Sequence, residues 1–142
     1  MHYEASVMVK APVQKTYSAY VEFESMPKWS KQASAVRILK KEGDTVQLEV
    51  EAPSSGGNRR VTTELRLCPF ESVESGGETR FTRTRRTVSF AAAPEGTTVT
   101  ASLEISMKGI WGLILRTRGK AEVEAAASDE LASFARYVEG LS

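Results

Sequence analysis

The stretch Lys120–Glu139, KAEVEAAASDELASFARYVE, decides how the rest of the chain is organised. It contains no proline or glycine, and its apolar residues recur at intervals of three and four, which is typical of an amphipathic helix. Gly140 follows where a C-terminal cap glycine is expected. We therefore expect a long helix that covers a broad apolar surface. The apolar stripe consists of Val123, Ala127, Leu131, Phe134 and Val138.

Two further features widen this helix face. The apolar cluster Ile110–Leu115 lies just upstream, so we expect the helix to reach from Gly109 to Leu141, with a kink near Gly119. A glycine weakens a helix interior by about 1 kcal/mol. Ordinary core packing and space left for a ligand both explain the small residues that run beside the stripe. These are Ala121, Ala125, Ser128, Ala132 and Ala135.

The segment between residues 35 and 107 is expected to form an antiparallel sheet. Apolar and polar residues alternate along it, which turns one face of each strand toward a core and the other toward water. The clearest case is Thr97–Met107, in which the odd positions from Val99 onward are apolar. Tyr3–Val9 follows the same rule and predicts a first strand. Turns are expected at Gly43-Asp44, Pro53–Asn58, Ser75–Gly77 and Pro94–Gly96.

The alternation changes phase between residues 78 and 93. Phe81 is apolar at an odd position, whereas Val88 and Phe90 are apolar at even positions. A strand cannot keep one face inward through such a change without an inserted residue. We therefore expect a turn or a bulge within Arg83–Arg86, and a turn there brings the sheet to about seven strands.

Two short helices are expected after the first strand. Pro12 suits the first position of a helix, and the apolar residues of Val13–Val21 follow at helical spacing. A further turn at Phe23–Met26 is stopped by Pro27. Because no repeat, linker or low-complexity segment interrupts the chain, residues 1–142 are expected to form a single α+β domain.

Four short stretches of the sequence stand out, Ala11-Pro12, Val13-x3-Tyr17, Phe23-x2-Met26-Pro27-x-Trp29 and Ser34-x-Val36. In these stretches the chain resembles the superfamily of START-related lipid-transfer proteins, birch-pollen allergens, polyketide cyclase/dehydrases and coenzyme-Q-binding proteins (SRPBCC). The resemblance in element order covers essentially the full chain. It implies the helix-grip fold, a curved antiparallel sheet wrapped around a long C-terminal helix with a hydrophobic cavity between them.

The composition narrows the classes of function. The chain has 142 residues with a net charge of +1, so no global field favours nucleic acid. With a single cysteine and a single histidine, an internal disulfide is excluded and most metal sites are disfavoured. The longest apolar run is far shorter than the ~20 residues of a bilayer span. We expect a cytoplasmic protein without cofactor or metal.

Catalytic residues are not expected from the sequence pattern. His2 has outward parity at the N-terminus, and Cys68 has outward parity with no basic partner nearby in the pattern. The glutamates at positions 49, 51, 64 and 104 also have outward parity. The inward polar and apolar residues are suited to binding a ligand rather than to moving protons. The residues expected to contact a ligand are Tyr17, Tyr20, Thr63, Leu65, Phe81, Leu103, Trp111, Ile114 and Leu115.

A set of arginines is expected to surround the mouth of the cavity. If the chain turns within Arg83–Arg86, that turn lies beside the Pro53–Asn58 loop, because alternate connections of an antiparallel meander share one end. Such a rim suits a ligand with an anionic head or transient contact with an anionic membrane. The alternative is a solvated strand face whose arginines pair with glutamates. The rim residues are Arg59, Arg83, Arg85, Arg86 and Arg118.

Three functions are compatible with these observations. The first is a binding or carrier protein for a hydrophobic small molecule, such as a lipid, a quinone or a polyketide-like compound, held between sheet and C-terminal helix. The second, suggested by the resemblance, is a polyketide-type cyclase or dehydratase that acts in the same cavity. The third is a protein-interaction module, which a filled core and a large exposed apolar patch would favour.

Overall fold

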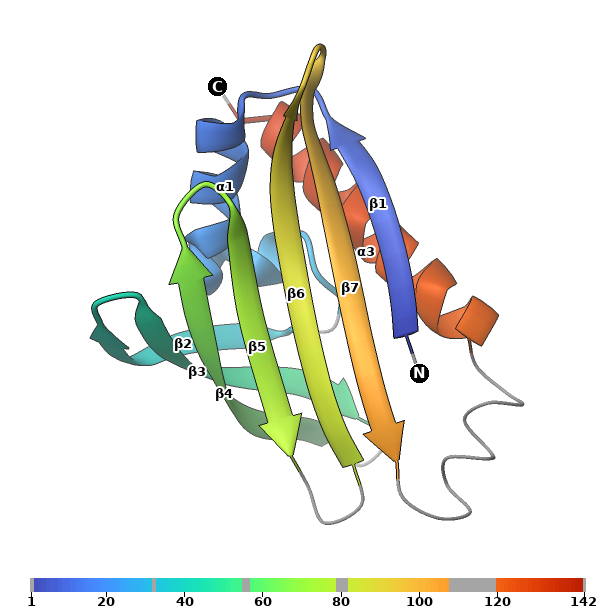
Figure 1. Ribbon diagram of the computed structural model, residues 1–142. Coiled ribbons are helices and arrows are strands. Elements are labelled where there is room, and N and C mark those ends of the chain that lie inside the picture. Colours follow the sequence, from blue (N-terminus) through green and yellow to red (C-terminus); the bar gives the residue numbers. More distant parts are fainter. Residues whose placement is uncertain (1, 32, 55–56, 79–81, 108–119, 142) are drawn as a thin grey trace.

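The computed structural model describes residues 2–31, 33–54, 57–78, 82–107 and 120–141. The strands are β1 (His2–Val9), β2 (Ala35–Glu42), β3 (Thr45–Ser54), β4 (Gly57–Cys68), β5 (Ser72–Glu78), β6 (Thr82–Ala93) and β7 (Gly96–Met107). The helices are α1 (Val13–Val21), the 3-10 helix η1 (Phe23–Lys28) and α3 (Lys120–Glu139). The strands form one antiparallel sheet in the order β1-β7-β6-β5-β4-β3-β2, with the helices on one face (Figure 1). The seven-stranded sheet with a long C-terminal helix packed on it confirms the predicted fold.

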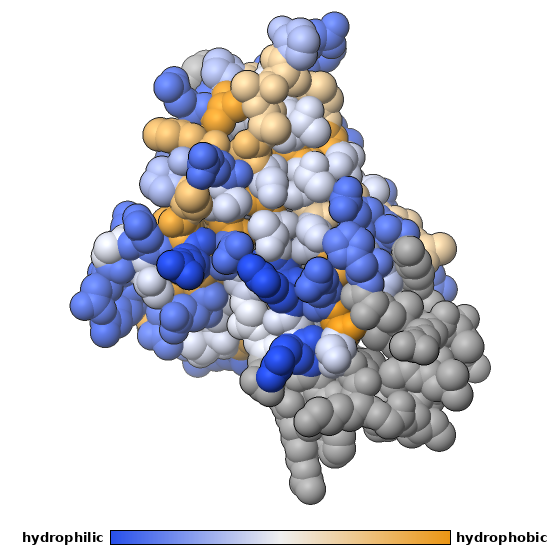
Figure 2. All heavy atoms as spheres, viewed as in Figure 1, coloured by the Kyte–Doolittle hydropathy of each residue, from blue (hydrophilic) through white to orange (hydrophobic). Residues whose placement is uncertain are grey.

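The core lies between the sheet and the helices, and it uses the alternation seen in the sequence. Val9 of β1, Val99 of β7 and Val88 of β6 are almost completely buried, each on the inward face of its strand. Phe134 and Val138 of α3 meet them from the helix side and are equally buried. The outer face of the sheet, by contrast, is largely hydrophilic (Figure 2).

The predicted stripe of α3 is confirmed over its second half. Leu131 is buried, whereas Val123 and Ala127 are half-buried, so the helix enters the core progressively toward its C-terminus. The helix ends at Glu139, and the amide of Gly140 donates to the Arg136 carbonyl at 3.1 Å without the positive φ that is typical of a cap glycine. Of the row of small residues, Ala121, Ala125 and Ser128 are exposed, Ala132 is half-buried and Ala135 is buried. Residues 109–119 lie outside the described residues.

Two predicted turns are wrong. Strand β6 runs straight through Arg83–Arg86, with an unbroken register from Thr82↔Met107 to Ala93↔Gly96. Ser75–Gly77, the other expected turn, lies inside β5 and pairs with β6. The chain reverses instead at Pro69–Glu71, where Phe70 has a φ of +64°. Within β6 the inward positions Arg86, Val88 and Phe90 are all in phase, and Phe81, from which the phase change was inferred, lies outside the described residues.

The separation of β4 from β5 shapes the interior. Strand β4 pairs with β3 along most of its length, from Ser54↔Gly57 to Thr45↔Arg66, but only Glu64–Cys68 pairs with β5. Among the described residues, the β4–β5 ladder ends at Glu64↔Gly76. The sheet therefore opens on one side of this pair, and β2, β3 and β4 bend away from β5, β6 and β7 (Figure 1).

Candidate functional site

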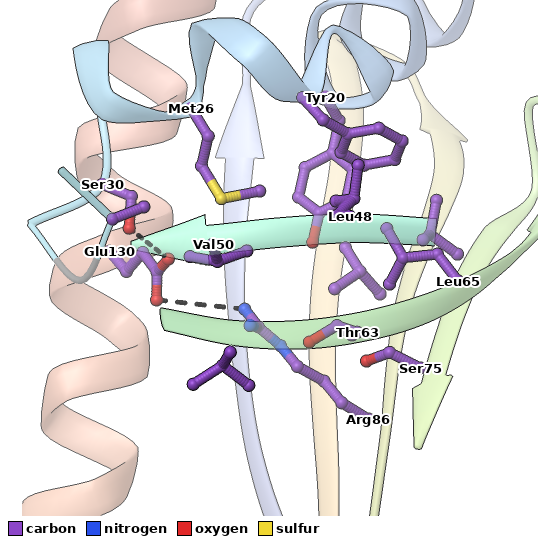
Figure 3. A pocket seen from close by; sticks show the side chains of 15 residues that line it. Tyr20, Met26, Ser30, Leu48, Val50, Thr63, Leu65, Ser75, Arg86 and Glu130 are labelled. Atoms are coloured by element: carbon purple, nitrogen blue, oxygen red, sulfur yellow. Dashed lines mark hydrogen bonds and ion pairs between the residues drawn. The ribbon is translucent and has the colours of Figure 1, made fainter. Parts of the chain in front are cut away.

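A cavity of about 200 Å³ lies in this bend, between the sheet, η1 and α3. Most of its wall is apolar, because β3, β4, β5 and β6 each turn their inward positions toward it. The 3-10 helix η1 closes it from above in the view of Figure 3. The residues that line it are Tyr20, Phe23, Met26, Ser30, Ala33, Leu48, Val50, Val61, Thr63, Leu65, Val73, Ser75, Arg86, Val88 and Glu130.

An ion pair crosses one end of the cavity. The carboxylate of Glu130, on α3, accepts a hydrogen bond from the Ser30 hydroxyl at 2.9 Å through Oε1. Its other oxygen, Oε2, faces the guanidinium of Arg86, on β6, at 3.9 Å (Figure 3). The Glu130 side chain is only 11% accessible, whereas that of Arg86 is 38% accessible and borders the cavity. Charged groups are thus present in a chamber whose wall is mostly apolar.

Tyr20 places a phenol at the same cavity. Its ring packs edge to face on Phe90 and Phe134, each with ring centroids 5.5 Å apart. Burial raises the pKa of Tyr20 above its ordinary value, an effect that nearby Arg86 opposes and Glu130 reinforces. The phenol therefore stays neutral at physiological pH and acts as a hydrogen-bonding group.

The surroundings of Arg86 favour its protonated, positively charged form. The Tyr20 oxygen raises the pKa of Arg86, burial opposes that effect, and Glu130 adds to it. The guanidinium therefore remains a permanent cation that borders a mostly apolar space. A cation in such a place is available to a ligand that carries a complementary group.

The structure brings together part of the predicted set of ligand-contacting residues. Tyr20, Thr63 and Leu65 line the cavity. Tyr17 lies elsewhere, packed edge to face against Phe70 and Phe90 with ring centroids 5.3 and 5.4 Å apart. Leu103 of β7 is half-buried and is not part of the described lining. Phe81, Trp111, Ile114 and Leu115 lie outside the described residues.

The predicted arginine rim is divided between two faces of the sheet. Arg85 is exposed on the outer face and pairs with Glu74 at 3.4 Å. Arg83 shares the outward parity of Arg85, and both border a groove there. Arg86 instead lies inside the cavity, because consecutive residues of the continuous strand β6 point to opposite sides. The side chain of Arg59, and Arg118 altogether, lie outside the described residues.

Sequence reasoning missed the charged residue that faces Arg86. Glu130 follows Ala127 by three positions and precedes Phe134 by four, so helical spacing alone places it on the buried stripe of α3. A glutamate on the apolar stripe of a helix could therefore have indicated a buried carboxylate. The inward parity of Arg86 with Val88 was the matching signal on β6. The cavity therefore holds a carboxylate and a guanidinium that the sequence pattern had not placed there.

The remaining reactive residues lie away from the cavity. The His2 side chain is about half accessible and contacts Glu4 at 3.2 Å on the strand surface. The thiol of Cys68 is exposed and donates to Glu71 at 2.8 Å, and that hydrogen bond raises the pKa of the thiol. A thiol held in its protonated form is a poor nucleophile.

The described part of the chain offers neither a metal cluster nor a membrane span. No group of three histidine, cysteine, aspartate or glutamate residues suited to a metal ion occurs among residues 2–31, 33–54, 57–78, 82–107 and 120–141. None of the helices described is long and apolar enough to cross a membrane.

Comparison with solved structures identifies similar folds at low sequence identity. The protein TTHA0849 of Thermus thermophilus is 20% identical, with a TM-score of 0.78 and 97% of both chains covered. The Zhui aromatase/cyclase from a Streptomyces species is 14% identical, with a TM-score of 0.74 and coverage of 98% of this chain and 93% of that one. A START superfamily protein from Mycobacterium smegmatis is 18% identical, with a TM-score of 0.69 and coverage of 98% and 94%.

Sequence comparison identifies the family. No curated protein matches the chain. The family described as polyketide cyclase / dehydrase and lipid transport, however, matches residues 1–139. The matched residues include the whole sheet and the C-terminal helix that packs on it. The chain therefore belongs to the polyketide cyclase/dehydrase and lipid transport family.

Proposed function

We propose that this protein binds and carries a small hydrophobic molecule in the cavity between sheet, η1 and α3. The observation that carries the proposal is the composition of its lining, with apolar side chains from four strands and only a few polar groups among them. Small-molecule sites are typically apolar with a few well-placed polar groups that orient the ligand.

The size of the cavity favours a compact ligand. Its volume of about 200 Å³ lies below the ~300–1,000 Å³ that is common for ligand pockets. A compound of one or two rings, or a short branched chain, suits that space better than a long-chain lipid. The chain belongs to a family described by polyketide chemistry and lipid transport, and such a ligand is compatible with that description.

The test uses a neutral two-ring probe, 2-naphthamide, titrated by isothermal calorimetry. Thr63 lines the cavity, whereas its neighbour Thr62 is exposed on the opposite face of β4. Thr63→Phe fills the chamber and should weaken binding by at least about tenfold, which corresponds to ~1.4 kcal/mol. Thr62→Phe adds the same ring outside and should leave the affinity unchanged. Equal affinities for the two variants, or no binding to the wild type, contradict the proposal.

A cyclase or dehydratase is a second candidate, favoured by one observation. Tyr20, Arg86 and Glu130 line the same cavity, so a proton donor, a cation and a carboxylate all face the space a substrate would occupy. Such groups can donate a proton, stabilise a developing enolate and accept a proton, respectively. One similar structure is that of an aromatase/cyclase.

Product analysis separates the enzyme from the carrier. A linear poly-β-ketone would be incubated with wild type and with Glu130→Gln, which keeps the shape of the side chain and removes its basicity. An enzyme should give cyclised, dehydrated product at least about a hundredfold faster with wild type than with the variant, in line with the usual contribution of a general base. Product formation at the buffer rate in both samples rules out the enzyme.

A further inference from the structure

The Arg86 guanidinium has unused capacity for hydrogen bonding. A guanidinium has five N–H donors in a planar fork. The nearest carboxylate oxygen, on Glu130, lies 3.9 Å away, which is beyond the 2.7–3.2 Å of a hydrogen bond. Among the described residues, no side-chain hydrogen bond is formed by Arg86. The attraction between Arg86 and Glu130 is therefore electrostatic. The N–H donors of the guanidinium remain available to bond to a ligand.

Glu130, in contrast, has a partner of its own. Its Oε1 accepts the hydrogen bond from Ser30 at 2.9 Å, and Ser30 is itself buried. This contact holds the carboxylate at the wall of the cavity independently of Arg86. The cation can therefore take a new partner while Glu130 keeps its place.

We propose that Arg86 binds the carboxylate of an organic acid whose apolar body fills the cavity, and that Glu130 is the internal counter-ion this acid replaces. The inference rests on the proposed function, because it names the chemical class of the ligand held in the same cavity. A planar carboxylate matches the guanidinium fork with two parallel hydrogen bonds. A neutral carbonyl can also accept hydrogen bonds from the guanidinium, but it lacks the additional attraction between a cation and an anion.

The surrounding groups agree with an acid of this kind. The hydroxyls of Thr63 and Ser75 line the cavity near Arg86, where they can bond to a bound carboxylate (Figure 3). Opposite them, Leu48, Val50 and Met26 offer an apolar surface to the body of the ligand. Around Arg86 the cavity thus offers polar groups to a charged head and, across from them, apolar side chains to a hydrophobic body.

Because the ligand and Glu130 compete for Arg86, removing the charge of Glu130 should increase the affinity for an acid. Glu130→Gln keeps an oxygen for the hydrogen bond from Ser30 but removes the charge that attracts Arg86 and repels an incoming anion. This variant should bind an acid more tightly than the wild type does. A cavity in which Arg86 and Glu130 serve only to stabilise the fold has no reason to behave in this way.

The experiment compares two nearly isosteric probes, 2-naphthoate and 2-naphthamide, by calorimetry at pH 7. The wild type should prefer the acid by at least about tenfold, and Glu130→Gln should increase that preference by at least about threefold through tighter acid binding. Arg86→Gln should abolish it. Because Arg86→Gln leaves Glu130 without its cation and can impair folding, the double variant Arg86→Gln/Glu130→Gln removes both charges and should bind the two probes equally.

Each outcome decides between the two proposals. If the wild type binds the amide as tightly as the acid, or if the double variant retains the preference for the acid, Arg86 does not recognise a carboxylate. In either of these cases, binding of the amide still supports an apolar small-molecule site. If neither probe binds to the wild type, the proposed function falls and this inference falls with it.

Discussion

Trp29 and Phe134 pack edge to face, with ring centroids 4.9 Å apart and an angle of 60° between the rings. Trp29 follows η1, and Phe134 lies on α3, so this contact joins the early helical corner to the C-terminal helix. Tyr20 completes the cluster, with its ring centroid 5.8 Å from that of Trp29. The cluster fixes the two walls that hold Ser30 and Glu130 at the cavity.

Loss of the Trp29 ring should destabilise the fold substantially. The side chain is only 6% exposed, so Trp29→Ala should lower the free energy of unfolding by about 3–5 kcal/mol. The indole Nε1 has no hydrogen-bond partner among the described residues, so Trp29→Phe sacrifices packing alone and should cost about 1–2 kcal/mol. Urea unfolding followed by far-ultraviolet circular dichroism measures both. An unchanged midpoint for Trp29→Ala would show that the ring is not part of the core.

Gly96, in the tight connection from β6 to β7, should not tolerate a side chain. Its φ is +153°, and an added Cβ would lie 2.0 Å from the Val9 carbonyl oxygen. Gly96→Ala should therefore cost about 3 kcal/mol or more in thermal or urea unfolding, since the backbone of β1 must move. Gly43→Ala is the matched control, because a Cβ there meets nothing within 4 Å and costs only the ~1–2 kcal/mol for a positive φ. Similar losses in the two variants would contradict this packing.

The stability of the protein should fall steeply in alkaline solution because of Tyr20. Burial raises the pKa of Tyr20 in the folded state, so the unfolded chain loses the proton first, at about pH 10. The stabilisation is complete below pH 10 and is lost as the pH rises from there toward the raised folded pKa. In that range, Tyr20 contributes a slope of up to ~1.4 kcal/mol per pH unit.

Urea unfolding between pH 9 and 11.5 tests this dependence. Tyr20→Phe removes the titrating group while keeping the ring contacts with Phe90 and Phe134. The variant should therefore lose stability less steeply than the wild type above pH 10. Coincident slopes for the two proteins would show that the Tyr20 phenol is hydrated in the folded state.

The fold was accessible from the sequence because it depends on repeated local patterns. Alternation in Tyr3–Val9 and Thr97–Met107, and helical spacing in Lys120–Glu139, each involve many residues that agree. Single irregularities were harder to place. The reversal at Phe70 depends on a positive φ in one residue, and the sequence Ser75–Gly77 resembles a turn although β6 holds it in a strand.

The site was only partly accessible for a different reason. Parity indicated that Thr63 and Leu65 face inward, and helical spacing did the same for Tyr20, which follows from secondary structure alone. The pairing of Arg86 with Glu130 joins residues 44 positions apart on a strand and a helix, so it depends on how α3 crosses the sheet. Local periodicity shows which face each residue occupies but does not show which residues meet across the core.

The central claim is that an apolar small molecule occupies this cavity, and mapping by methyl NMR tests it most directly. Titration with 2-naphthamide should give saturable shifts concentrated on methyl groups of the lining, which are those of Met26, Leu48, Val50, Leu65, Val73 and Val88. The methyl groups of Val9 and Val99, buried outside the lining, should move little. Shifts confined to exposed methyl groups such as those of Met8, Ile38 and Leu39, or the absence of saturable shifts, would contradict the claim.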